Sequence, residues 1–208
     1  MTSIDNTSAI IEFTRLYLAV FYSAVALFYT IKIITTKKNI NTELIFLGER
    51  YCPNWWNHMT FRIFRVAIWM VCLVRLFVPA LDDYLGLIPS LENAPMLISG
   101  NVLLTFGFLM TIAIHFSMSE KWRSGIDPIG PKKLITDGFF RYSRNPIFVS
   151  VGLSQIGFFL ALPSVFTLVC LVIGLYTLYK QTIAEEAHLA AVFPSEYKHY
   201  TTNVRRWL

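Results

Sequence analysis

Charged residues are scarce in this chain of 208 residues. Asp, Glu, Lys and Arg make up 15% of it, whereas soluble domains carry about 25%. Apolar residues make up 55%, and the mean hydropathy is +0.52. So little polar surface excludes one or two soluble domains, and so much apolar sequence excludes disorder. The composition predicts an integral membrane protein.

Cysteine is also rare, with three residues in the chain. Cys72 and Cys170 fall within apolar runs, and the three cysteines have neither metal-ligand spacing nor the even number of a disulfide framework. The sequence contains no Walker loop, no GxGxxG fingerprint and no HExxH helix, and we expect no metal site. Because no Lys or Arg precedes the first apolar stretch, we expect no cleavable signal peptide.

Long apolar segments organise the chain. Three cover about residues 13–34, 61–81 and 96–116, and residues 147–179 contain no charge. A single helix over that last stretch would be about 50 Å long, against a hydrocarbon core of about 30 Å. We therefore predict an all-α protein with five transmembrane helices, the last two forming a tight hairpin at Pro163 over residues 147–180. Gly152, Gly157 and Gly174 are predicted to let these two helices approach closely.

The distribution of basic residues predicts the orientation. Sixteen of the 18 Lys and Arg residues flank the first connection, lie in the third or follow the last helix. The second connection carries Asp82, Asp83 and Glu92 and no base. The positive-inside rule then places the N-terminus outside and the C-terminus in the cytoplasm. Topology thus explains the net charge of +5, and no nucleic-acid partner is expected. Arg75, near the outer end of the second helix, is interpreted as a structural residue that snorkels to the surface.

Two polar blocks face the predicted cytoplasmic side. Residues 131–148 lead into the hairpin and residues 181–206 follow it. Because a hairpin returns the chain to the side from which it came, the blocks should meet in space. A basic connection and a solvated helix face would also explain the residue types. However, Glu185 and Glu186 lie near a membrane surface that favours bases, which indicates a polar pocket balanced by Arg144 or Lys132.

The order of residues in the two blocks carries a resemblance. The first block reads Lys133-Leu134-Ile135-x-x-Gly138-x-Phe140-x-x-x-Arg144-Asn145-Pro146-x-Phe148, and the second reads Glu185-Glu186-x-x-Leu189-x-x-x-Phe193-Pro194-x-Glu196-Tyr197-x-x-Tyr200. Together they resemble the paired signatures of the isoprenylcysteine carboxyl methyltransferase and phospholipid methyltransferase-like family, which also straddle a helical hairpin. The resemblance covers about residues 118–208.

This resemblance implies an integral membrane methyltransferase that uses S-adenosylmethionine and lacks a Rossmann domain. It divides the chain into an N-terminal membrane region of three helices, residues 1–116, and a cofactor-binding catalytic region, residues 117–208. It implies catalytic roles for Glu185, Arg144 and Gln181. The implied cofactor-binding residues are Lys132, Leu134, Ile135, Gly138, Phe140, Asn145, Pro146, Ile147, Phe148, Glu185 and Glu186.

The sequence departs from the family pattern at several of these positions. Lys132 and Asn145 stand where histidine is frequent, and Phe140 and Phe148 stand where tyrosine is frequent. Gln181 stands where prenylcysteine-methylating members carry an arginine that would hold the substrate carboxylate. A neutral amide is a weaker carboxylate anchor than a guanidinium. Cofactor binding and methyl transfer are compatible with these changes, whereas the prenylcysteine substrate is less so.

Several functions follow as alternatives. The first is carboxyl O-methylation of an isoprenylcysteine-like acceptor, and the closest others are phospholipid N-methylation and S-methylation of a small thiol. A membrane reductase that uses NADPH and a non-enzymatic scaffold are further ones. The expected partners are a lipophilic or lipidated acceptor and membrane lipids, and a homodimer is left open. We expect a multi-pass protein with its active site on the cytoplasmic side, in a bacterial inner membrane or the endoplasmic reticulum.

Overall fold

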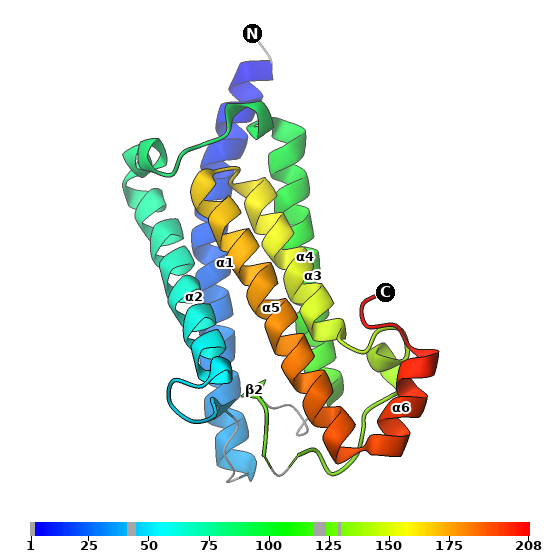
Figure 1. The fold of residues 1–208 in the computed structure, drawn as a ribbon. Helices are drawn as coiled ribbons and strands as arrows, with labels where there is room; N and C mark the ends of the chain where they lie inside the picture. Colours follow the sequence, from blue (N-terminus) through cyan, green and yellow to red (C-terminus); the bar gives the residue numbers. More distant parts are fainter. Residues whose placement is uncertain (1–2, 41–44, 119–123, 129) are drawn as a thin grey trace.

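The computed structural model describes residues 3–40, 45–118, 124–128 and 130–208, and most of them are helical, as predicted. Five long helices run up and down in a bundle (Figure 1). They are α1 (Ser3–Ile40), α2 (Pro53–Phe77), α3 (Ala94–Met118), α4 (Pro146–Ala161) and α5 (Val165–Val192), and the shorter α6 (Pro194–Asn203) follows. The helices α1, α3 and α5 all finish at the same end of the bundle, which we call the site end. The opposite end is the far end.

Local sequence sets where the helices begin and end. Cys52 caps α2, because its sulfur accepts a hydrogen bond from the Trp55 backbone N–H. Pro163 and Ser164 separate α4 from α5, and Ser164 forms a capping box with Thr167 at the start of α5. The predicted hairpin is therefore correct. The second helix of the hairpin continues twelve residues past the predicted end at 180, to Val192, and so carries Glu185 and Glu186.

In the part of the chain that the structure describes, three helices are long and apolar enough to cross a membrane. They are residues Thr7–Thr35 of α1, all of α3 and all of α5. α2 is 25 residues long but carries Arg62, Arg65 and Arg75. α4 is apolar but has 16 residues, about 24 Å of helix. The structure thus supports a multi-pass membrane protein, whereas the five spans and their orientation stay a prediction.

Glycines bring α3 and α4 into close contact. A Cβ on Gly157 of α4 would lie 2.3 Å from the Leu104 backbone nitrogen, and one on Gly100 of α3 would lie 2.2 Å from the Ala161 nitrogen. The prediction that Gly157 faces the other arm of the hairpin is therefore wrong, because its partner is α3. Gly174 does meet α4, with the Gln155 side chain over it, and Gly152 makes an ordinary contact with Leu175.

Replacing Gly157 with alanine is expected to lower the free energy of unfolding by about 1–3 kcal/mol, since the new methyl group would overlap backbone atoms that cannot move aside. Thermal or denaturant unfolding in detergent measures this loss. Gly152→Ala is the matched control on the same helix, because its Cβ would stand 3.6 Å from the nearest atom, in the Leu175 side chain. Equal stabilities of the two variants would contradict this packing.

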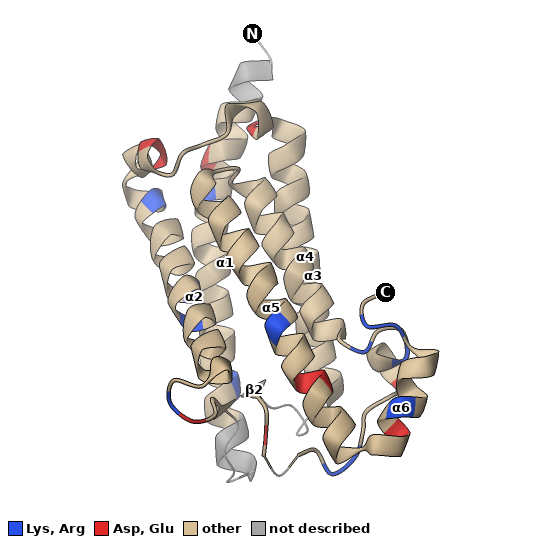
Figure 2. Ribbon diagram, viewed as in Figure 1, with Lys and Arg blue, Asp and Glu red and all other residues tan. Residues whose placement is uncertain are grey.

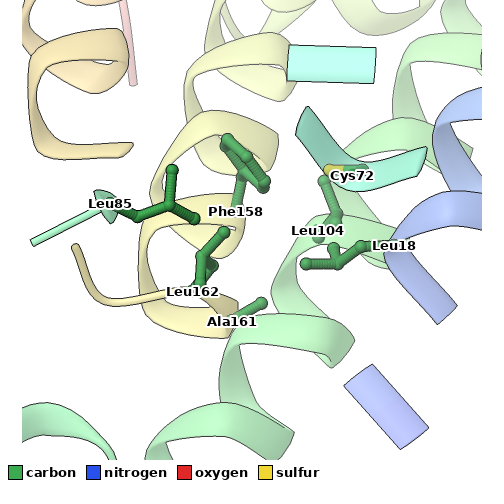
Figure 3. Close-up of a cluster of buried hydrophobic side chains, with 7 residues drawn as sticks. All are labelled: Leu18, Cys72, Leu85, Leu104, Phe158, Ala161 and Leu162. Atoms are coloured by element: carbon green, nitrogen blue, oxygen red, sulfur yellow. The ribbon is translucent and has the colours of Figure 1, made fainter. Parts of the chain in front are cut away.

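The apolar core lies between the helices towards the far end. Leu18, Cys72, Leu85, Leu104, Phe158, Ala161 and Leu162 form one buried cluster there (Figure 3). The connection between α2 and α3 closes this end, because the Ile88 N–H donates to the Pro163 carbonyl at 2.9 Å and the Val165 N–H donates to the Gly86 carbonyl at 2.8 Å. The turn of the hairpin is thereby fixed to the rest of the bundle.

Arg75 forms part of an ion-pair cluster at the far end. It is 3% exposed and donates through Nε and Nη2 to the carboxylate of Asp82. Arg15 of α1 shares the same carboxylate at 2.6 Å. The structural role predicted for Arg75 agrees with these bonds, but the predicted snorkelling is wrong: a carboxylate within the fold compensates the buried charge. Asp82 therefore links α1, α2 and the turn Pro79–Tyr84.

Candidate functional site

The two polar blocks meet at the site end, as the hairpin predicts. Asn145, the residue before α4, donates through Nδ2 to Glu186 Oε1 of α5 at 2.9 Å. Arg206 donates through Nε to the other oxygen of Glu186 at 3.1 Å, and Arg144 Nη2 lies 3.6 Å from Oε1. We call these four residues, Arg144, Asn145, Glu186 and Arg206, the Glu186 network. It joins three segments that are far apart in the sequence.

The backbone of residues 205–206 fixes the first block against this network. The Arg144 N–H donates to the Arg205 carbonyl at 3.0 Å. The Arg206 carbonyl accepts from Ser143 Oγ and from Asn145 Nδ2, each at 3.2 Å. Figure 2 shows the basic residues that gather around α6 and the segment after it. Both oxygens of Glu186 are thus engaged by groups of the protein.

α6 packs on the loop that holds other predicted site residues. Leu134 is buried against Tyr197 and Tyr200, and the Tyr200 hydroxyl donates to the Phe140 carbonyl at 2.6 Å. Burial raises the pKa of Tyr200 to about 12, so this hydroxyl stays a donor at neutral pH. Leu134 and the Phe140 backbone therefore contact α6.

The other predicted cofactor residues lie on both sides of the start of α4. Lys132 is exposed, and so is Gly138, which has φ +59° and begins the short 3-10 turn Gly138–Arg141. Pro146 is buried as the first residue of α4, and Ile135, Ile147 and Phe148 are half-buried. They lie in the loop before α4 and in its first turn, and their contact with a cofactor stays a prediction.

Glu185 belongs to a second polar group, between α5 and α2. Gln181 Nε2 donates to Glu185 Oε1 at 2.9 Å, one turn along α5. Asn57 of α2 donates through Nδ2 to Gln181 Oε1 at 2.9 Å and to the Thr177 carbonyl at 3.2 Å. We call Asn57, Gln181 and Glu185 the Asn57–Glu185 chain. The remaining oxygen of Glu185 has no hydrogen bond to any residue that the structure describes.

The two adjacent acids therefore have different surroundings. Successive residues of an α-helix point about 100° apart, so Glu186 faces the start of α4 while Glu185 faces α2. Glu186 is 8% exposed and bonded at both oxygens, and its charge is balanced by arginines. Glu185 has one oxygen that accepts no hydrogen bond from a described residue. The resemblance treats the pair as one feature, and the structure separates it into two.

Two residues that neighbour the Asn57–Glu185 chain in the sequence carry unpartnered polar atoms. Nε2 of His58, next to Asn57, and Nε2 of His188, one turn after Glu185, are buried without a hydrogen bond to a described residue. A Cβ on Gly125 would lie 2.9 Å from the first nitrogen, and a Cβ on Gly130 would lie 3.5 Å from the second. Unpaired buried polar atoms cost free energy that a polar ligand can recover. Donors and acceptors here suit an organic ligand with amino and hydroxyl groups.

An apolar recess of about 200 Å³ lies between the first block and α3. It is lined by Met110, Phe139, Tyr142, Ser143, Pro146, Val149 and Leu208. Ligand pockets usually enclose about 300–1,000 Å³, so the recess suits part of a ligand, such as one end of an apolar chain. Among the described residues, no three His, Cys, Asp or Glu side chains are grouped to hold a metal ion.

Asn57 and Arg206 are polar partners that sequence reasoning missed. Arg206 lies in the second block, but nothing in its spacing indicates that it pairs with Glu186. Asn57 lies before the second apolar segment, among aromatic residues and without a motif. Its hydrogen bond to Gln181 spans 124 positions of the sequence, so only the packing of α2 on α5 reveals it.

Comparison with known proteins found a family match that covers the first block and part of the second. Residues 95–196 match the model of a family described as phospholipid methyltransferase, which spans α3, the hairpin and the start of α6. No curated protein and no solved structure gave a significant match. The family match supports a membrane methyltransferase assignment for this chain, and it does not specify the isoprenylcysteine carboxyl branch.

Proposed function

We propose that this protein transfers a methyl group from S-adenosylmethionine to a lipophilic acceptor at the site end of the bundle, where α5 meets the first block on one face and α2 on another. The hydrogen bond between Asn145 and Glu186 carries the proposal most directly, because it joins the two signature blocks at 2.9 Å. The family match over residues 95–196 independently supports methyl transfer.

The residues at the site end fit this cofactor chemically. S-adenosylmethionine offers amino, carboxylate and hydroxyl groups, and it supplies a methyl group already activated by a sulfonium. The free oxygen of Glu185 accepts from an amino or hydroxyl group, and His58 and His188 offer unpaired ring nitrogens. Lys132, Ile135 and Phe148 remain proposed contacts.

The protein's own residues mainly position the methyl donor and the acceptor and exclude water from the site. Methyl transfer needs donor and acceptor in line at about 3–3.5 Å, in a site with little water. The Glu186 network holds the loop at the start of α4 against α5, and an apolar recess between this loop and α3 is lined by Met110 and Val149. Glu185 can hold a proton released by an acceptor, since its second oxygen is free of protein donors.

The charges favour an amine as the acceptor. Gln181 and Asn57 are neutral amides and Glu185 is an acid, so this side of α5 offers an acceptor for the N–H of an amine and gives a carboxylate no charged anchor. Arg144 and Arg206 are engaged by Glu186. We therefore propose an amine headgroup of a membrane lipid. Carboxyl O-methylation of an isoprenylcysteine-like substrate is the alternative. S-methylation of a thiol has less support from these charges.

Calorimetry on the purified protein in detergent tests the reaction class. We expect S-adenosylmethionine to bind and NADPH not to bind, and we expect Glu185→Ala to weaken the affinity at least tenfold through one lost charged hydrogen bond. Glu49→Ala is the matched control, because Glu49 is an exposed acid in the connection before α2. Binding of NADPH alone would indicate a reductase, and binding of neither ligand would indicate a scaffold.

A further inference from the structure

The Asn57–Glu185 chain has a direction that one backbone group determines. The Thr177 carbonyl can only accept a hydrogen bond, and it lies 3.2 Å from Asn57 Nδ2. The amide nitrogen of Asn57, and not its oxygen, must therefore face α5. That nitrogen also meets the Gln181 amide, so Gln181 must present its oxygen to Asn57. The Gln181 nitrogen is then left to face Glu185.

The orientation of the Gln181 amide determines whether Glu185 faces a hydrogen-bond donor or an acceptor. With its nitrogen toward Glu185, Gln181 donates at 2.9 Å and stabilises a carboxylate. With the amide reversed, the Gln181 oxygen would face Glu185 and repel a carboxylate. A carboxylate at Glu185 favours the same orientation, but a protonated Glu185 could instead donate to a reversed Gln181 amide, so these two residues alone allow both arrangements. Asn57, on another helix, supplies the constraint.

We infer that Asn57 is a positioning residue for the methyl-transfer site: by orienting the Gln181 amide, it directs the Gln181 nitrogen to Glu185 Oε1 and leaves the second oxygen of Glu185 to accept from the ligand. The inference rests on the proposed function. It gives α2 a defined part in the site, although α2 lies outside residues 95–196 and carries no signature. The alternative is that Asn57 only joins α2 to α5 and adds stability.

Two substitutions separate these roles. Asn57→Asp keeps the size of the side chain but replaces the donating nitrogen with an oxygen, so it should turn the Gln181 amide over. Asn57→Ala removes the constraint. A purely stabilising Asn57 would matter through folding alone, whereas a positioning Asn57 acts only through Glu185. Asn101→Ala is the control, because Asn101 is a buried asparagine whose donation to Thr14 joins α3 to α1 and not α2 to α5.

The chain offers a direct probe of the Gln181 amide. It contains two glutamines, Gln155 and Gln181, so labelling with ¹⁵N-glutamine gives two side-chain NH₂ signals in the NMR spectrum. Gln155 lies between α4 and α5 near Gly174 and serves as the internal reference. We expect Asn57→Asp and Glu185→Ala, which add no glutamine, each to move the Gln181 signal and to leave that of Gln155 in place.

Affinity for S-adenosylmethionine tests the consequence. We expect Asn57→Asp and Glu185→Gln each to weaken binding about tenfold, and the double variant to bind no more weakly than Glu185→Gln alone. Asn101→Ala should bind as the wild type does. A hundredfold loss in the double variant, or wild-type affinity in Asn57→Asp, would overturn the positioning role while leaving the proposed function intact. Wild-type protein that fails to bind S-adenosylmethionine would overturn both, whatever the Gln181 signal does.

Discussion

Replacing Asp82 with asparagine is expected to lower the free energy of unfolding by about 3–5 kcal/mol, the largest loss of stability that we predict for one residue. Two arginines share this single carboxylate, and Arg75 is 3% exposed. Without the acid, two guanidinium groups would face each other in a site that admits little water. Unfolding in detergent, followed by circular dichroism, measures the change.

Asp83→Asn is the control for this prediction, since the neighbouring acid is exposed. Acid pH gives a second readout. Burial tends to raise the pKa of Asp82, but the hydrogen bonds from Arg75 and Arg15 outweigh it and hold the pKa below the ordinary 3.8. Asp82 thus adds stability above about pH 4 and loses it as the pH falls through the lowered pKa. Equal stabilities of Asp82→Asn and Asp83→Asn would contradict the cluster.

Replacing Glu186 with glutamine is expected to cost about 2–3 kcal/mol of stability. Loss of one partner from a fully buried ion pair costs about 3–5 kcal/mol, and the partial exposure of the Arg206 side chain, 37%, reduces that figure. The change should loosen residues 143–146 and 205–206 together, because both segments are bonded to this carboxylate. Hydrogen exchange of the Arg144 N–H, which is bonded to the Arg205 carbonyl, reports on that loosening.

The adjacent Glu185→Gln variant is the matched comparison. Its partner is the neutral Gln181, so removing the charge should change stability little while weakening ligand binding. Adjacent acids are thus expected to show opposite patterns, one in stability and the other in affinity. If Glu185→Gln destabilised the protein as much as Glu186→Gln, the two acids would belong to one network and our division of the site would fail.

Much of the site region could be predicted from the sequence, because it depends on features that are local in the chain. Pro163 and the length of the uncharged stretch predict a hairpin, and a hairpin necessarily returns residues 181–206 to residues 131–148. The bond between Asn145 and Glu186 is the outcome of that geometry. The ends of the helices follow from caps and prolines in the same way.

What the sequence could not predict depends on which helix faces which. Gly157 has the small size that favours close packing, but its partner is α3 and not α5. Arg75 is charged near a helix end, and only the position of Asp82 distinguishes burial in an ion pair from snorkelling. Asn57 lies 124 positions from Gln181, and no spacing rule connects them. Each case requires the rotation of one helix about its axis relative to another, which periodicity alone does not determine.

One measurement tests the central claim most directly. Purified protein would be placed in vesicles that contain phosphatidylethanolamine and supplied with S-adenosylmethionine carrying a radiolabelled methyl group. We predict label in the amine headgroup with the wild type and with Glu49→Ala, and little label with Glu185→Ala. Label in the carboxyl ester of an added prenylated cysteine would retain methyl transfer and change the acceptor. The absence of label in any acceptor, or transfer that Glu185→Ala leaves unchanged, would contradict the account.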